Sequence, residues 1–169
     1  MSFIEHFKNG GFVIVADDVH RENELDLIIA AEHITPEKMN ALIRWGTGVI
    51  CTPMTKKHAI SLNLYQMVSQ NKDPNGTNYT VSVDSKNCTT GVSAYDRFLT
   101  VKDMLSLDKN LIRSPGHMFP LVAHNELLNK RRGHTEAAVQ LCLLANLTPI
   151  AIIVEIINDD GTMTRLSDI

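Results

Sequence analysis

The chain has 169 residues, of which 44% are hydrophobic and 21% charged, and its formal net charge is -3 at pH 7. This length supports one buried core, and the charge balance argues against a nucleic-acid-binding surface. No run reaches the roughly 20 apolar residues of a membrane span, and residues 1–10 lack a signal-peptide pattern. We therefore expect a single domain over residues 1–169, located in the cytoplasm, whose partner is a small molecule rather than nucleic acid or a membrane.

The first elements in chain order are two short apolar runs, residues 12–16 and 27–31, each of strand length. Thr35 and Pro36 then form a helix start, with a capping hydroxyl followed by proline at the first helical position. Apolar residues at helical spacing continue to Gly46, and residues 49–52 indicate the next strand. This mixture predicts an α+β fold rather than strictly alternating strands and helices.

The segment between the first two strands is unusually rich in charge, running Arg21-Glu22-Asn23-Glu24-Leu25-Asp26. If it is extended, the alternation of side chains places Glu22, Glu24 and Asp26 on one face, where like charges repel unless a cation lies among them. Three oxygen donors on one face suit Mg²⁺. A solvated acidic loop explains this segment alone about equally well.

Residues 80–83 alternate between polar and apolar, as a half-buried strand does, and the apolar positions between residues 95 and 105 fit a helix. Further along, a basic loop precedes another helical pattern. We expect Gly133 to break the backbone and a helix to begin near Thr135, aiming its free N–H groups at the loop. Arg131 and Arg132 beside such a helix start would suit a phosphate, and His134 adds an imidazole that can bind a metal or move a proton. Taken alone, this segment is more often simply a basic loop that caps a helix.

Two further residues each allow two interpretations. Glu155 interrupts the apolar run of residues 151–157, so it is either exposed on an edge strand or buried with a raised pKa that suits proton transfer. His117 follows Pro115-Gly116 and is either an exposed turn residue or a functional imidazole. The strand of Glu155 is expected to close in a turn at residues 158–161 and to continue as a hairpin through residue 165.

Six strings in collinear order resemble the 3,4-dihydroxy-2-butanone-4-phosphate synthase family of riboflavin biosynthesis. The resemblance runs from about residue 10 to residue 165, which is nearly the whole chain. Its strings are R-E-N-E-L-D (21–26), T-V-S-V-D (80–84), T-T-G-V-S-A-Y-D-R (89–97), P-G-H-M-F-P-L (115–121), R-G-H-T-E-A (132–137) and D-G-T-M-T-R (160–165).

The resemblance implies one α+β domain in which a mixed sheet is packed by helices in a three-layer arrangement. It also implies a lyase that converts D-ribulose 5-phosphate into 3,4-dihydroxy-2-butanone 4-phosphate and formate. The expected cofactor is Mg²⁺, with Mn²⁺ as the alternative cation. The family is homodimeric, and each active site is completed by residues from both subunits.

The same resemblance assigns roles residue by residue. The metal ligands are expected to be Glu22 and His134. His117 and Glu155 are the expected essential catalytic groups, and Glu24 and Asp26 assist in acid–base steps. The substrate is expected to contact Arg21, Glu22, Asp26, Thr90, Arg131, Arg132, Gly133, His134 and Thr135.

Several positions depart from the family pattern. Leu25 stands where glycine is usual and is expected to stiffen or reshape the acidic loop. Asn125-Glu126 replaces a glycine pair, Gln140 an aspartate and Asn146 a glycine, and relatives continue beyond Ile169. Three hypotheses follow: the ordinary synthase, a divergent paralogue acting on a related phosphosugar, and a non-catalytic phosphosugar- or metal-binding homologue.

Overall fold

The computed structural model describes residues 2–169. The described residues form one sheet with the strand order β1-β2-β6-β3-β5-β4. The neighbours β3 and β5 are parallel, and the other neighbouring pairs are antiparallel. The strands are β1 (Val13–Ala16), β2 (Leu25–Ala30), β3 (Cys51–Met54), β4 (Val83–Ser85), β5 (Ile112–Val122) and β6 (Ala151–Glu155).

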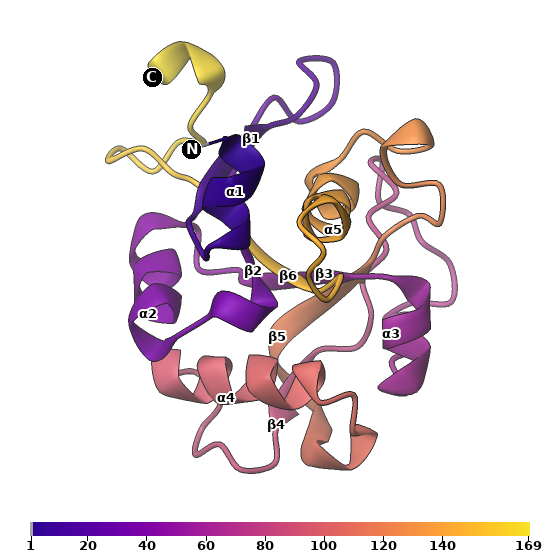
Figure 1. Ribbon diagram of the computed structural model, residues 1–169. Coiled ribbons are helices and arrows are strands. Elements are labelled where there is room, and N and C mark those ends of the chain that lie inside the picture. Colours follow the sequence, from indigo (N-terminus) through magenta and orange to yellow (C-terminus); the bar gives the residue numbers. More distant parts are fainter. Residues whose placement is uncertain (1) are drawn as a thin grey trace.

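Helices cover both faces of this sheet (Figure 1). The helices α1 and α5 pack on one face, and α2 and α4 lie on the other, where α3 contributes Ala59 to the core. The result is the three-layer α+β arrangement that the resemblance implied. The helices are α1 (Phe3–Lys8), α2 (Pro36–Trp45), α3 (Lys56–Ser61), α4 (Ala94–Leu105) and α5 (His134–Leu144).

The register of the central strands fixes which side chains share a face. Ile28 pairs with Ile153, Ile153 with Cys51, and Cys51 with Phe119, so one row crosses four strands. Ile28, Cys51 and Ile153 are buried in the cluster beneath α5. Because side chains alternate along a strand, residues two positions away, such as Asp26, also face α5.

Most predicted elements are present with ends shifted by a few residues. Thr35 caps α2 by accepting a hydrogen bond from the Lys38 N–H, and Pro36 is its first residue. The predicted hairpin also forms, because the Asn158 N–H donates to the Thr162 carbonyl and the Thr164 N–H to the Ile156 carbonyl. Local capping and turn chemistry therefore identified these elements correctly.

The region of His117 is a strand and not a turn, which was one of its two interpretations. Residues 115–117 lie inside β5, a strand that its own proline and glycine content had obscured. Gly116 is needed because a Cβ there would lie 2.0 Å from the Val83 carbonyl carbon of the neighbouring strand. The predicted strand over residues 80–83 is shorter than expected, since Thr80 makes only an isolated bridge and β4 begins at Val83.

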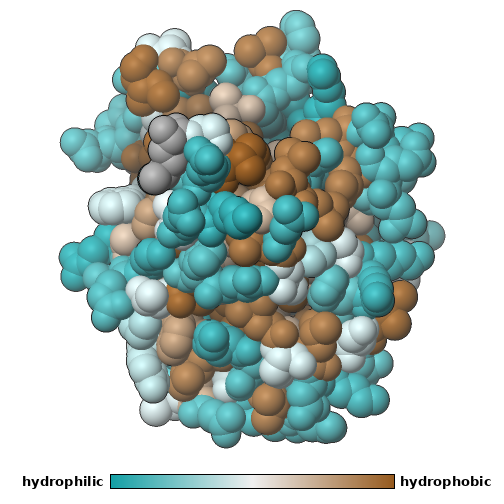
Figure 2. Space-filling model, viewed as in Figure 1, coloured by the Kyte–Doolittle hydropathy of each residue, from teal (hydrophilic) through white to brown (hydrophobic). Residues whose placement is uncertain are grey.

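Figure 2 shows the surface in the same view. Hydrophilic side chains cover much of both flanks, and apolar side chains are exposed in patches between them. One patch lies at the top over the C-terminal turn, where Leu166 and Ile169 are exposed. Among residues 2–169, no helix has the length and apolarity required to span a membrane.

Candidate active site

The loop between β1 and β2 is organised by Asp17, which directly follows β1. Its Oδ1 accepts a hydrogen bond of 2.9 Å from the Glu24 N–H, and its Oδ2 accepts 3.2 Å from the Glu22 N–H and 2.7 Å from Arg21 Nη1. Burial raises the pKa of Asp17, but these hydrogen bonds outweigh it and the net pKa is lowered. Sequence reasoning missed Asp17, although a carboxylate directly after a strand end was an available signal.

The acidic segment is not extended as the alternation argument assumed. Asn23 has a φ of 54°, and β2 begins only at Leu25, so the segment folds back on itself. The carboxylates converge nonetheless: Glu22 Oε2 and Asp26 Oδ1 lie 3.9 Å and 3.3 Å from His134 Nδ1. Asp26 is only 2% exposed, so the solvated-loop interpretation is wrong.

His134 is the first residue of α5, and Gly133 is its N-cap, close to the predicted helix start. Its Nε2 lies 3.1 Å from the Val15 carbonyl oxygen, which assigns the ring proton to Nε2 and leaves a lone pair on Nδ1. Burial lowers the pKa of His134 to about 4, against the attraction of Asp17. The imidazole is therefore neutral at pH 7, in the form that binds metal ions.

Asp26 is the carboxylate most removed from water. Burial raises its pKa well above the usual value, and repulsion from Glu155, Glu22 and other carboxylates raises it further. Its Oδ1 has no hydrogen-bond partner among residues 2–169. Asp26 lies directly opposite Glu155 in the β2–β6 pair.

Glu155 is the last residue of β6 and is half-buried. The edge-strand interpretation is wrong, because β6 lies between β2 and β3. Glu155 Oε2 accepts a hydrogen bond of 2.7 Å from Thr47 Oγ1. Its cross-strand neighbour Asp26 is more deeply buried, with only 2% of the residue exposed.

A divalent cation fits this cluster. Asp17, Glu22 and His134 each offer a ligand atom, and these atoms lie within 4.8 Å of one another. Two carboxylates and a neutral imidazole suit Mg²⁺ or Mn²⁺. The unpartnered Oδ1 of buried Asp26 faces the same space, so a cation would also relieve the repulsion among the acids.

Two arginines adjoin the acidic cluster at the start of α5, Arg21 paired with Asp17 and Glu22, and Arg131 with Glu136. A Cβ on Gly133 would lie 2.4 Å from Arg131 Nη1 and 3.1 Å from Arg21 Cζ, so both guanidinium groups crowd against this glycine. The buried Thr135 follows in the first turn of the helix. Arg132 instead points to solvent, with 79% of its side chain exposed and Asp18 at 3.7 Å. Its contact with substrate stays a prediction.

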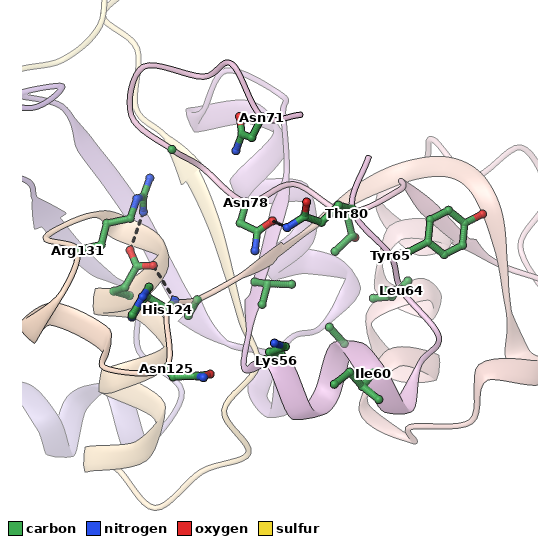
Figure 3. A pocket seen from close by; sticks show the side chains of 16 residues that line it. Lys56, Ile60, Leu64, Tyr65, Asn71, Asn78, Thr80, His124, Asn125 and Arg131 are labelled. Carbon is green, nitrogen blue, oxygen red and sulfur yellow. Dashed lines mark hydrogen bonds and ion pairs between the residues drawn. The ribbon is translucent and has the colours of Figure 1, made fainter. Parts of the chain in front are cut away.

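Two cavities open beside this region. One of about 320 Å³ is lined by Asp17, Gly133 and His134. The other, of about 540 Å³, lies between Arg131 and the start of α3, where Lys56 and Ile60 line it (Figure 3). Both are large enough for a small molecule.

The remaining predicted residues form a separate cluster at β4 and β5. His117 Nδ1 lies 2.9 Å from Asp84 Oδ2, and the His117 N–H donates to Asp84 Oδ1 at 2.8 Å. Gly91 has a φ of 86°, and a Cβ there would lie 2.6 Å from His117 Nδ1, so the loop that carries exposed Thr90 packs against the pair. With 46% of its side chain exposed, His117 presents Nε2 to solvent while the buried Asp84 holds Nδ1.

The strand order keeps the two clusters apart within one chain. Asp26 is on β2 and His117 on β5, with β6 and β3 between them. Three strand spacings amount to roughly 14 Å. The hydrogen bonds and ion pair of His117 go to Asp84, and none among residues 2–169 links it to the residues around His134.

The candidate cation ligands Asp17, Glu22 and His134 form what we call the cation-type cluster. A layered α+β fold with this cluster beside a helix start that can bind an anion suits an enzyme of phosphorylated small molecules. A sequence profile described as 3,4-dihydroxy-2-butanone 4-phosphate synthase matches residues 1–169. The chain belongs to this family.

Individual relatives agree with this assignment. The chain is 49% identical over 164 residues to a 3,4-dihydroxy-2-butanone 4-phosphate synthase of Oceanobacillus iheyensis, covering 96% of this chain and 79% of the relative. The synthase of Pyricularia oryzae is 51% identical over 160 residues, with coverages of 92% and 69%.

Solved structures show the same fold. A 3,4-dihydroxy-2-butanone 4-phosphate synthase in complex with two magnesium ions matches with a TM-score of 0.90 and 48% identity, over 97% of this chain and 80% of the other. RibBX, a two-domain synthase from A. baumannii, matches with a TM-score of 0.93 and 38% identity, over 98% of this chain and 49% of that protein.

Proposed function

We propose that this chain, as a single domain over residues 1–169, converts D-ribulose 5-phosphate into 3,4-dihydroxy-2-butanone 4-phosphate and formate for riboflavin biosynthesis. One observation carries the proposal beyond family membership. The cation-type cluster of Asp17, Glu22 and His134 directly adjoins the start of α5, where Arg21 and Arg131 converge. A phosphosugar can thus place its phosphate at the helix start and its polar carbons beside the acids.

Glu22 and His134 would hold Mg²⁺, or Mn²⁺ in its place, with Asp17 contributing or orienting from the loop. A relative that contains two magnesium ions supports this choice of metal. When bound, a divalent cation supplies positive charge that stabilises negative charge developing on the oxygens of the sugar. The Val15 carbonyl oxygen holds His134 in the tautomer that presents Nδ1 for this role.

The acid–base work would fall to carboxyl groups around the cation and to His117. Asp26 retains a proton to higher pH than an exposed aspartate and can deliver it into the site. Glu24 has a pKa raised by burial, against the attraction of Arg165. Glu155 lies opposite Asp26 on the neighbouring strand, and the Thr47 hydroxyl orients the Glu155 carboxylate.

The phosphate would bind between Arg21 and Arg131, on the N–H groups at the start of α5 and on the Thr135 hydroxyl. The positive end of the helix dipole and two guanidinium groups act in the same direction. Gly133 permits this approach because a larger residue would collide with both guanidinium groups.

We also propose a homodimer in which His117 and Thr90 of the partner subunit complete each site. The separation of the two clusters within one chain supports this arrangement. His117 presents Nε2 outward, and exposed Val92 and Tyr95 follow Thr90 closely in sequence. Sedimentation equilibrium should give twice the 18.8 kDa chain mass. A monomer that is fully active would contradict the shared site.

The activity itself is tested by incubating the purified chain with D-ribulose 5-phosphate, with Mg²⁺ or with EDTA. Mass spectrometry should detect formate and the four-carbon phosphate in equal amounts, only when the metal is present. Proton exchange into the substrate without formate would favour the divergent paralogue. Binding of metal and substrate without any turnover would favour the non-catalytic homologue.

A further inference from the structure

The segment of residues 71–77 is a compact loop that braces itself. Asn71 Nδ2 donates to the Thr77 carbonyl at 2.8 Å, and Asn71 Oδ1 accepts from the Asp73 N–H at 2.9 Å. The Thr77 N–H in turn donates to Asp73 Oδ2 at 2.6 Å. These hydrogen bonds join the two ends of the loop, so residues 71–77 form one structural unit.

Arg131 holds this loop against the start of α5. Its Nε donates to the Asn75 carbonyl at 3.1 Å and its Nη2 to Thr77 Oγ1 at 3.0 Å. Its Nη1 pairs with buried Glu136 at 2.6 Å, and Glu136 also accepts from the His124 N–H at 3.0 Å (Figure 3). Glu136 thus fixes the Arg131 guanidinium, and the guanidinium in turn holds the loop through Asn75 and Thr77.

The loop held in this way brings one side chain to the cation-type cluster. Asn75 Nδ2 donates to Glu22 Oε1 at 2.9 Å, across 53 residues of sequence. The other oxygen of the same carboxylate, Oε2, is the one that lies 3.9 Å from His134 Nδ1. Asn75 therefore holds one carboxylate oxygen of Glu22, and the other, which also accepts a hydrogen bond of 2.5 Å from Arg21 Nη1, lies toward His134.

We infer that Asn75 is a positioning residue, which orients Glu22 for the divalent cation through its side-chain amide. The inference rests on the proposed function, because it needs Glu22 to bind the metal. An amide is suited to the task because it donates a hydrogen bond without adding charge to a crowded acidic site. Groups that orient a metal ligand by hydrogen bonding typically change metal affinity by about 10–100-fold when they are removed.

The test is a titration of the full-length, metal-free protein with Mn²⁺, followed by electron paramagnetic resonance without substrate. We expect Asn75→Ala to weaken Mn²⁺ binding by about 10–100-fold. In turnover assays the same variant should need more metal for half-maximal rate, while kcat at saturating metal and KM for the phosphosugar stay near the wild-type values. Asn75→Gln, which keeps the amide donor, should recover part of the affinity.

Asn71→Ala is the matched control, because Asn71 braces the same loop without touching Glu22. Its Mn²⁺ affinity should stay within about 3-fold of wild type, which is far less than the loss expected at Asn75. Equal losses in both variants would overturn the inference in favour of general loosening of the loop. An unchanged affinity in Asn75→Ala would also overturn it.

Glu22→Gln separates this inference from the proposed function. If wild type binds Mn²⁺ and Glu22→Gln does not, the proposed metal site is supported. The result for Asn75→Ala then tests only whether Asn75 orients Glu22. If wild type binds no Mn²⁺, or Glu22→Gln binds it normally, the proposed metal site fails and the inference fails with it.

Discussion

The two polar clusters of this chain handle their histidines in opposite ways. His134 is buried, has a pKa lowered to about 4, and faces several carboxylates. His117 is almost half-exposed and is paired with the single carboxylate of Asp84. The first environment keeps an imidazole neutral as a ligand, and the second leaves one ring nitrogen free to accept or give a proton.

The comparison shows that burial, more than residue type, assigns the roles. Desolvation gives His134 a lone pair for a cation and keeps the proton on Asp26 to higher pH. In the homodimer that we propose, the exposed His117 acts at the site of the partner subunit. Each of the following substitutions tests one side of this contrast.

The largest effect is expected for Glu22→Gln. Removing one charged ligand from the buried cluster should cost several kcal/mol of transition-state stabilisation, or about 10³-fold in kcat/KM. Mn²⁺ binding by electron paramagnetic resonance should weaken in parallel. Normal activity without metal binding would refute the cation's role.

Asp84→Asn should lower kcat by about 10²-fold, because the carboxylate orients His117 through two hydrogen bonds. The Kd for Mn²⁺ should remain that of wild type, since the pair lies in the other cluster. Steady-state kinetics and metal titration on the same sample check this. A simultaneous loss of metal binding would show that the clusters are not independent.

Asp26→Asn should lower kcat by about 10²-fold or more, yet stabilise the metal-free protein at pH 7. The folded-state pKa of Asp26 is raised, so the folded protein binds more protons than the unfolded chain above pH 3.8. The free energy of unfolding of the wild type therefore falls as the pH rises from 3.8 toward the raised pKa of Asp26. The side chain of the Asp26→Asn variant does not titrate at this position, so the variant does not lose this stability. Urea unfolding in EDTA should show a gain at pH 7 that shrinks as the pH approaches 4. A stability loss at pH 7 would contradict the assignment.

The smallest effect on activity is expected for Leu25→Gly, which restores the residue usual in the family. Leu25 is 1% exposed in β2, so its loss should cost about 3 kcal/mol of unfolding free energy. Activity at low temperature should stay within about 2-fold of wild type, because Leu25 packs in the core. Thermal unfolding and the product assay measure both. A large change in kcat would instead favour the hypothesis of a divergent paralogue that acts on a related phosphosugar.

Two departures from the family pattern have plain structural explanations. Leu25 lies in β2, and the positive φ of this loop falls on Asn23, so position 25 does not need the conformational freedom of glycine. Asn146 has a φ of 56°, a conformation that asparagine tolerates better than most residues, so it replaces glycine at modest cost.

Local chemistry made much of the fold predictable, including the start of α2 at Thr35 and that of α5 after Gly133. The parts that were missed depend on distant partners. Asp17 gains its role only when the loop returns the Glu24 N–H to it, and Asp84 only when β4 pairs with β5. The place of Asp17 after a strand end was a local signal, but the partners of Asp17 and Asp84 cannot be read from nearby residues. The prolines of β5 argued against the strand that carries His117.

The shared site is tested most directly by mixed dimers, purified through two different tags. A dimer of one Glu22→Gln chain and one His117→Asn chain should regain about half of the wild-type activity, because one of its two sites is intact. A dimer of a wild-type chain and a chain with both substitutions should be inactive. The opposite pattern, with the first dimer inactive and the second half-active, would show that each site lies within one chain and would contradict the account.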